Sequence, residues 1–287
     1  MKRHLSTIII LAMFIVGLSV LLYPAISEYI NSRHASKVIA MHNEAVEKAA
    51  KEELDQLWHD ATDYNKRLAN DPGAFFAPER IKGYDKLLDI SGAGIMGYID
   101  IDRIKAELPI YHGTDKGVLQ IGVGHLEGTS LPVGGESTHC VLSGHRGLPS
   151  AKLFTDLDEL RIDDIFTLTI LDRKLTYRVD QIKTVKPEET ADLQIVPGKD
   201  YCTLLTCTPY GINTHRLLVR GVRVDTETEK AGIFVPNEAF LIDPLIVTPI
   251  AAIPMLAVLL TIVFISDTRK KKASNAASKE EKDTNED

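Results

Sequence analysis

The chain has 287 residues, a formal net charge of -7 and a charged fraction of 25%. This length allows one sizeable folded domain with appendages. An acidic chain of average charge density lacks the basic footprint of nucleic-acid-binding proteins, so we expect no nucleic-acid partner.

An apolar run near the N-terminus, residues 8–26, is almost uncharged and follows Lys2 and Arg3. At roughly 1.5 Å per residue, a helix of this length just crosses a hydrocarbon core of about 30 Å. A secretory signal peptide is the alternative, but the stretch 24–27 matches a small-residue cleavage site poorly. We therefore expect residues 1–30 to be a cytoplasmic tip and an uncleaved transmembrane anchor.

A second apolar run, residues 245–265, carries no charge and is followed by a basic block at 269–272. Basic flanks prefer the cytoplasmic side, which places residues of about 30 to 240 outside the cell. Pro249 and Pro254 would kink this helix without abolishing it. We expect residues 229–266 to be a juxtamembrane segment and a C-terminal transmembrane helix, and the polar residues 267–287 to be a disordered cytoplasmic tail.

Residues 31–91 are expected to form an extracellular helical region. Between positions 35 and 68 the apolar residues recur at three- and four-residue spacing, which indicates an amphipathic helix packed on a partner. The sequence Asn-Asp-Pro-Gly at 70–73 ends this helix. Phe75 and Phe76 follow in an otherwise polar stretch.

Residues 92–228 change to short apolar runs separated by Gly, Pro and Asp clusters. These runs predict strands at 95–101, 118–124, 139–143, 165–171, 175–179, 201–206 and 217–224. Short strands at this spacing, with at most brief helices such as 151–160, indicate an all-β barrel or sandwich.

Three residues in this region can carry nucleophilic chemistry: Cys207, His145 and Arg216. A free thiol with a pKa of about 8.5 is mostly protonated at neutral pH, so a nucleophilic cysteine needs a base or a cation beside it. The alternation of apolar residues places Cys207 at the end of a rigid strand. The sequence leaves open whether His145 takes the proton on substrate binding or rests paired with a thiolate.

The residues around this trio resemble the sortase family. Thr203-Leu204-Leu205-Thr206-Cys207 matches the sortase signature Thr-Leu-x-Thr-Cys, and the run Ser-Gly-His-Arg-Gly-Leu-Pro at 143–149 adds to it. With the segments 124–132, 153–157 and 215–221, the resemblance to class C sortases, the pilin-polymerising branch, covers about residues 92–225.

The resemblance implies a fold and three roles. The fold is a mostly β, sortase-type closed barrel with short helices, flanked by two transmembrane helices. Cys207 is then the nucleophile, His145 the general acid and base, and Arg216 the residue that holds the substrate or its oxyanion. Arg220 shares a strand face with Arg216 and competes for the role, whereas Arg223 points the other way. We favour Arg216 because the family's functional arginine takes the position after His215.

The implied reaction is attack on the Thr-Gly bond of an LPxTG-like sorting signal, followed by transfer of the thioester to an acceptor lysine on a pilin subunit. No cofactor is implied, and no residues have metal-ligand spacing. The alternatives are a housekeeping sortase that uses a peptidoglycan precursor, a thiol redox protein, which would lack the usual Cys-x-x-Cys, and a noncatalytic binding module. The implied location is the membrane of a Gram-positive bacterium, with the catalytic domain outside.

Class C sortases carry a lid with an Asp-Pro-aromatic motif, in which the aspartate pairs with the catalytic arginine and the ring covers the cysteine. Here Gly73 follows Asp71 and Pro72, and the rings of Phe75 and Phe76 are displaced along the chain. Two interpretations stay open: a working lid, or a turn that only ends the helix. We group these residues with Thr206 as candidate lid or substrate contacts.

Two further cysteines each lie five residues before a candidate catalytic residue: Cys140 before His145, and Cys202 before Cys207. An odd offset on a strand directs them to the opposite face. If the strands are parallel neighbours, as a sortase barrel implies, Cys140 lies near Cys202. We favour two buried thiols over a disulfide. His125 and His139 are expected to have no catalytic part.

Overall fold

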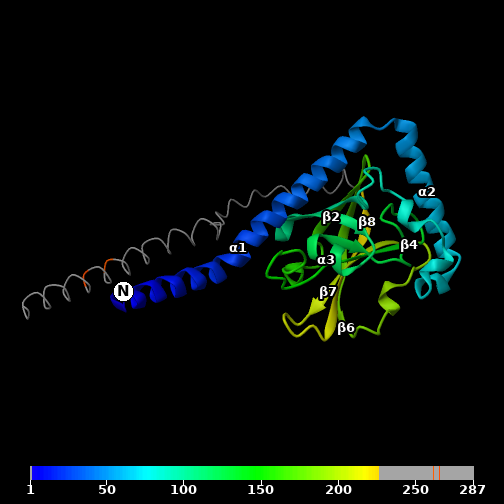
Figure 1. The fold of residues 1–287 in the computed structure, drawn as a ribbon. Coiled ribbons are helices and arrows are strands. Elements are labelled where there is room, and N and C mark those ends of the chain that lie inside the picture. The colour runs from blue at the N-terminus through cyan, green and yellow to red at the C-terminus, as the bar shows by residue number, and fades with distance from the viewer. Residues whose placement is uncertain (1, 226–260, 262–264, 266–287) are drawn as a thin grey trace, which may run out of the picture. The chain divides into compact units, whose positions relative to one another are not determined.

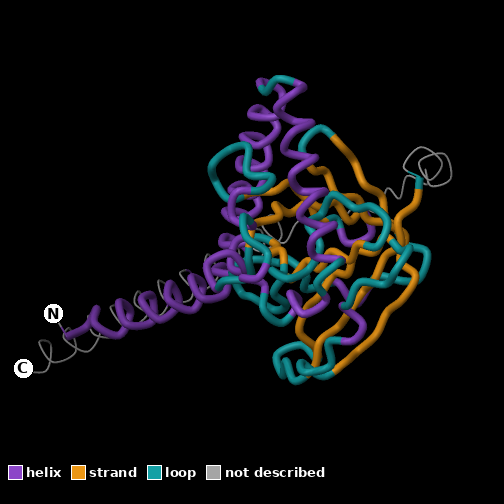
Figure 2. Tube along the Cα trace, turned by 90° about the vertical axis from the view of Figure 1, so that its right-hand side faces the viewer, coloured by secondary structure: helices purple, strands orange, loops and turns teal. Residues whose placement is uncertain are grey.

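The computed structural model describes residues 2–225, 261 and 265. Its described part contains two long helices, a closed eight-stranded barrel and several short helical turns (Figures 1 and 2). The expected mostly β barrel is confirmed. The expected C-terminal transmembrane helix and cytoplasmic tail lie outside the described residues, apart from Thr261 and Ile265.

The N-terminal region is helical in two pieces: α1 (Lys2–Lys48) and α2 (Lys51–Ala69). Among the described helices, α1 alone is long and apolar enough to cross a membrane, and its apolar part lies near the N-terminus. The sequence predicts separate helices at 8–26 and from 35 onward. The structure instead has one continuous helix, with Pro24 inside it, and the break falls at residues 49–50.

Helix α2 packs its apolar stripe against the barrel. Its buried side chains include Leu54, Ala61, Tyr64 and Leu68, which recur at the expected helical spacing and join the main core. Asn65, on the same face, is buried and exchanges hydrogen bonds with the backbone of Leu131 at 2.7 and 3.0 Å. The helix therefore fixes where the following segment, which begins at Asp71, meets the barrel.

Eight strands close the barrel in the order β1-β2-β3-β4-β7-β8-β6-β5. Pairing of β1 with β5 completes the ring, and the pairs β2/β3 and β4/β7 are parallel. The strands are β1 (Ile95–Ile101), β2 (Ala106–His112), β3 (Val123–His125), β4 (Thr138–Ser143), β5 (Ile165–Ile170), β6 (Arg173–Val185), β7 (Asp200–Thr208) and β8 (His215–Val224). Figure 1 labels the strands that position the site.

The connections are short helical turns and one short helix. They are η1 (Pro72–Phe75), η2 (Pro78–Arg80), η3 (Tyr84–Lys86), η4 (Asp102–Ile104), α3 (Lys116–Ile121), η5 (Leu157–Glu159) and η6 (Ala191–Leu193). Of the brief helix expected at 151–160, the structure keeps only the turn η5. Side chains that alternate inward along the strands fill the barrel interior in one continuous core.

One predicted strand was wrong, and one observed strand was not predicted. The predicted strand 118–124 is mostly helix α3, and β3 keeps only its last residues, because a short apolar run does not distinguish helix from strand. Strand β2 was missed because Pro109 argues against a strand interior. Pro109 fits because β3 pairs with β2 only from Ile110 onward, which leaves one edge of β2 open at the proline.

Candidate active site

The outer face of β4, β7 and β8 carries the candidate catalytic residues. Strand β7 lies between the other two. Val141, Leu205 and Leu218 belong to a small apolar cluster that is separate from the barrel core. Cys207 lies two residues after Leu205, and Arg216 lies two residues before Leu218. Because side chains alternate along a strand, both belong to this outer face.

Cys207 is the second-last residue of β7 and is partly exposed. Its antiparallel partner on β8 is Arg216. Residues directly opposite each other on antiparallel strands share a face, with their Cβ atoms about 4.5–5.5 Å apart. The barrel therefore holds a thiol and a guanidinium side by side on rigid strands, where the sequence analysis expected them.

His145 follows the end of β4. The parallel register pairs Ser143 of β4 with Leu205 of β7. Continued by two residues on each strand, this register brings His145 opposite Cys207. Two of the predicted trio thus lie on the neighbouring strands β7 and β8, and His145 follows the end of β4 on the other side of β7.

The backbone around His145 is fixed by hydrogen bonds. The amide of Gly144 donates to the Leu205 carbonyl at 3.0 Å, and the Thr206 hydroxyl donates to the Gly144 carbonyl at 2.7 Å. The amide of Phe154 donates to the carbonyl of His145 itself at 3.1 Å. A histidine held in this way would need little reorganisation to act as a base.

Burial lowers the pKa of His145 below its ordinary value of 6.5. Desolvation disfavours the charged imidazolium, so the neutral ring is the dominant form at neutral pH. A neutral imidazole can accept the thiol proton when substrate arrives. Of the two alternatives that the sequence left open, this direction supports proton transfer on substrate binding.

Arg216 and Arg220 differ in what holds them. Arg220 forms a bidentate pair with Asp180, at 2.9 and 2.8 Å, and lies over the Tyr201 ring. Arg216 donates only to backbone carbonyls, those of Asn213 and His215, at 3.3 and 3.1 Å. Among the described residues no carboxylate pairs with Arg216. Its charge is therefore available to a substrate, whereas that of Arg220 is neutralised.

The segment after α2 lies against the catalytic face. Phe75 packs on the outer apolar cluster, and the backbone at Ala74 and Phe75 approaches Gly128 so closely that a Cβ there would lie 3.0–3.1 Å from two carbonyl oxygens. Phe76 is 73% exposed. One of the two candidate aromatic residues therefore touches the face that carries Cys207, and the other does not.

Asp71 pairs with Arg80, its carboxylate 2.9 Å from the guanidinium Nε. The resemblance to class C sortases implied a pair with the catalytic arginine instead. The structure differs because 71–80 folds back on itself through two short helical turns, η1 and η2. Sequence reasoning missed Arg80, since a partner brought close by a loop leaves no periodic signal.

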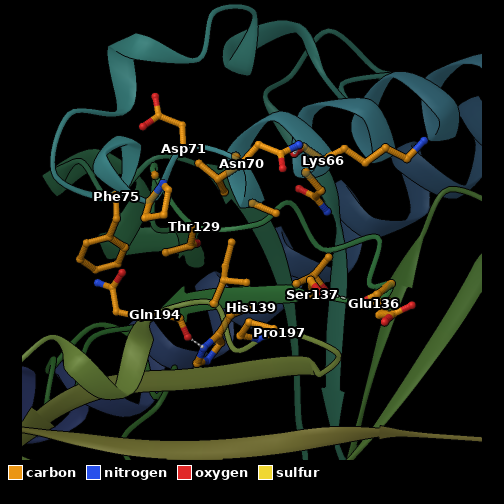
Figure 3. Close-up of a pocket in the computed structure, with 18 of the residues that line it drawn as sticks. Lys66, Asn70, Asp71, Phe75, Thr129, Glu136, Ser137, His139, Gln194 and Pro197 are labelled. Atoms are coloured by element: carbon orange, nitrogen blue, oxygen red, sulfur yellow. Dashed lines mark hydrogen bonds between the residues drawn. The ribbon is translucent and has the colours of Figure 1, made fainter.

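A cavity of about 570 Å³ lies beside this segment, between the end of α2, the β3–β4 loop and the η6 region (Figure 3). Asp71 and Phe75 line one side of it, and His139 and Gln194 lie on another. None of Cys207, His145 and Arg216 lines this cavity. It is linked to the catalytic face through Phe75, which belongs to both.

Thr206 is buried, with only 1% of its surface exposed, and its hydroxyl donates a hydrogen bond to the Gly144 carbonyl. This placement argues against the predicted contact with substrate. Thr206 instead ties β7 to the residue before His145.

Cys140 and Cys202 are register partners on the parallel strands β4 and β7, as the odd offsets predict. Both are free thiols, 2% and 0% exposed, in the barrel core. Burial raises the pKa of the Cys202 thiol well above its ordinary value. These thiols face away from Cys207 and pack as small hydrophobic groups in the barrel core.

His139 of β4 and His125 of β3 are buried and hydrogen-bonded. His139 contacts the Gln194 carbonyl at 2.9 Å and the Thr203 hydroxyl at 2.7 Å. His125 contacts the Tyr84 hydroxyl and the Ser130 carbonyl, at 2.9 and 2.8 Å. Such contacts fit a structural role.

Residues 99–224 match the sortase domain. Among solved structures, the chain is similar to sortase C1 of Streptococcus agalactiae, with 49% identity and a TM-score of 0.61, over 66% of this chain and 98% of that one. It is also similar to Streptococcus pneumoniae sortase C, described as informative on catalysis and pilin substrate specificity, with 43% identity and a TM-score of 0.57, over 66% and 97% of the two chains.

A further relative is sortase D of Bacillus subtilis, 34% identical over 131 residues, which are 45% of this chain and 63% of that protein. The chain spans about three fifths of the length of the curated relatives it matches.

Proposed function

The chain belongs to the sortase family of cysteine transpeptidases, and on that premise we propose that it is a membrane-anchored enzyme that joins pilin subunits through isopeptide bonds. The observation that carries the proposal is that Cys207 of β7 lies directly opposite Arg216 of β8, and that His145 follows the end of the neighbouring strand β4. Together these residues supply a base, a nucleophile and a cation that no carboxylate of the described residues neutralises.

In the first half-reaction, His145 removes the thiol proton as the sulfur of Cys207 attacks the threonine carbonyl of an LPxTG-like signal. The tetrahedral intermediate carries an oxyanion, which Arg216 stabilises. The Thr–Gly bond breaks, the imidazolium protonates the leaving amine of glycine, and a thioester forms on Cys207.

In the second half-reaction, the ε-amine of a lysine on another pilin attacks the thioester. His145 takes a proton from this amine, and the proton returns to the Cys207 sulfur as the C–S bond breaks. The product is an isopeptide bond and a restored thiol. The lysine must react faster than water, which a covered site favours by excluding solvent until the acceptor arrives.

The pilin branch is supported by the similarity to the class C enzymes above, since one of them is described in terms of pilin substrates. The alternative is a housekeeping sortase, which uses the same trio with a peptidoglycan-precursor amine. A thiol redox protein is a poor fit, because the two other cysteines are buried on the opposite strand face from Cys207.

We also propose that residues 71–80 form a lid over the catalytic face. The contact of Phe75 with the outer apolar cluster supports this role. The Asp71–Arg80 pair would hold the lid closed without neutralising Arg216. The apolar part of α1 would anchor the enzyme, with the barrel outside a Gram-positive cell membrane.

The test is incubation of the full-length enzyme, in detergent or vesicles, with candidate pilin subunits. The proposal expects a ladder of covalent polymers that is absent with Cys207→Ala and with pilins in which the acceptor lysine is replaced. A second reaction offers a peptidoglycan-type amine in place of pilin. Transfer to that amine with no pilin ladder would favour the housekeeping alternative.

A further inference from the structure

Arg146, the residue after His145, is almost fully covered: its side chain is 10% exposed. Its guanidinium Nη2 pairs with Asp158 of η5 at 2.5 Å, and Nη1 makes a long contact of 3.4 Å with the hydroxyl of Thr208, the residue after Cys207. The Tyr210 ring lies 5.9 Å from the guanidinium carbon. One side chain therefore contacts three segments around the catalytic pair.

These contacts lie between the strand ends that carry the chemistry. Arg146 follows the base in sequence, and Thr208 follows the nucleophile. Gly147, which follows Arg146, has a φ of 75° and is so close to Tyr210 that an added Cβ would lie 2.9 Å from the ring. The Arg146 contacts thus join the ends of β4 and β7 at a point where the backbone of Gly147 closely approaches Tyr210.

Stability alone does not account for this arrangement. The Nε–H group of Arg146 is buried and has no hydrogen-bond partner among the described residues, which is unfavourable for a charged donor. Arg103 holds the same η5 region more simply, with 2.8 Å to the Glu159 carbonyl and 3.1 Å to Asp164. Arg103 contacts neither catalytic strand end.

We propose that Arg146 is a positioning residue that fixes the spacing of His145 and Cys207 by joining the two strand ends to η5. The proposal deepens the proposed function and rests on it. Arg146 itself touches no reacting atom. Its removal therefore slows proton transfer and acylation while substrate binding is retained, because small errors in the placement of reacting groups are costly in rate.

The test compares Arg146→Gln with Arg103→Gln as the matched control, since each loses an arginine–aspartate pair near η5. With an LPxTG-type peptide, Arg146→Gln should lower the rate of thioester formation about 10- to 100-fold with KM nearly unchanged. Arg103→Gln should lower Tm to a similar degree and keep the wild-type rate. Compared with Arg146→Gln, Arg146→Lys should restore Tm more fully than it restores the rate of thioester formation, because an ammonium lacks the planar fork that contacts two partners at once.

A second measurement does not depend on the substrate: the pH profile of Cys207 alkylation. It should shift in Arg146→Gln toward the profile of His145→Ala. Asp158→Asn, which keeps the arginine, should give a smaller shift in the same direction and serves if Arg146→Gln fails to fold. Wild-type kinetics in Arg146→Gln, an equal rate loss in Arg103→Gln, or an unchanged alkylation profile would overturn the proposal. Wild-type enzyme that forms no thioester refutes the proposed function instead, and the alkylation profile still decides the role of Arg146.

Discussion

At the scale of single residues, the alternation of side chains along each strand determines which residues share the face of the candidate site. Odd offsets separate Cys202 from Cys207 and Cys140 from His145, and the structure buries Cys140 and Cys202 in the barrel core, on the strand face opposite to Cys207. This alternation does not decide which arginine faces the substrate, because Arg216 and Arg220 lie on the same face of β8. The choice depends on Asp180, which neutralises Arg220 and lies on another strand where no spacing rule reveals it.

The role of Arg216 predicts a difference between two arginine variants. Arg216→Lys should lower the acylation rate about 10²-fold or more, as loss of an oxyanion donor does, because the ammonium is a point charge on a flexible stem. Arg220→Lys should lower Tm with a small effect on that rate. Single-turnover acylation of each variant checks this, and equal rate losses would mean that Arg216 has no special role.

The lowered pKa of His145 predicts the acid limb of the rate profile. Only the neutral imidazole accepts the thiol proton, so activity falls as pH drops through the pKa of this residue. Because burial lowers that pKa, kcat/KM should stay high down to pH values below 6.5. The measurement is the rate of peptide acylation from pH 5 to 8; an acid limb well above pH 6.5 contradicts a neutral resting imidazole.

At the scale of elements, the strands that carry the site were predictable and the segment that covers it was not. Strands β4, β7 and β8 appear in the sequence as alternating apolar runs between turn residues. The segment 71–80 is held by the Asp71–Arg80 ion pair and by packing of Phe75 on the outer apolar cluster, and neither contact leaves a periodic pattern in the sequence. The missed strand β2 has a similar cause, since Pro109 fits only because a neighbouring strand starts late.

The Asp71–Arg80 pair predicts how the lid opens. Asp71→Ala should speed labelling of Cys207 by a thiol reagent, because it removes the ion pair that holds the lid segment. Arg80→Ala should speed labelling to the same extent. If Asp71 instead paired with Arg216, only Asp71→Ala would speed the labelling of Cys207, and Arg80→Ala would not. An unchanged labelling rate in both variants would mean that 71–80 is only a turn that ends α2.

The link between β4, β7 and the η6 region through His139 predicts an acid-sensitive fold. Burial lowers the pKa of His139 below 6.5, so the unfolded chain binds a proton that the folded chain does not, and stability falls as pH drops through 6.5 and below. His139→Gln should make the dependence of Tm on pH shallower between pH 7 and 5.

At the scale of the whole molecule, one barrel face unites the features on which the function depends. Cys207, His145 and Arg216 lie at one end of the row formed by β4, β7 and β8, and the apolar cluster beneath Phe75 continues along the same face. Under the proposed function, this layout would shield a thioester on Cys207 from water without disturbing the trio. The sequence indicated the trio through a family motif, and the register places Cys207 directly opposite Arg216.

The most direct test of this account is intact-mass analysis of the enzyme after reaction with an LPxTG-type peptide, in the wild-type and Asp71→Ala backgrounds. The account predicts an added mass equal to that of the peptide acid ending at threonine less one water, released by hydroxylamine as a thioester requires and absent in Cys207→Ala. The absence of an adduct in both backgrounds, or an adduct that persists in Cys207→Ala, would contradict the claim that Cys207 is the nucleophile.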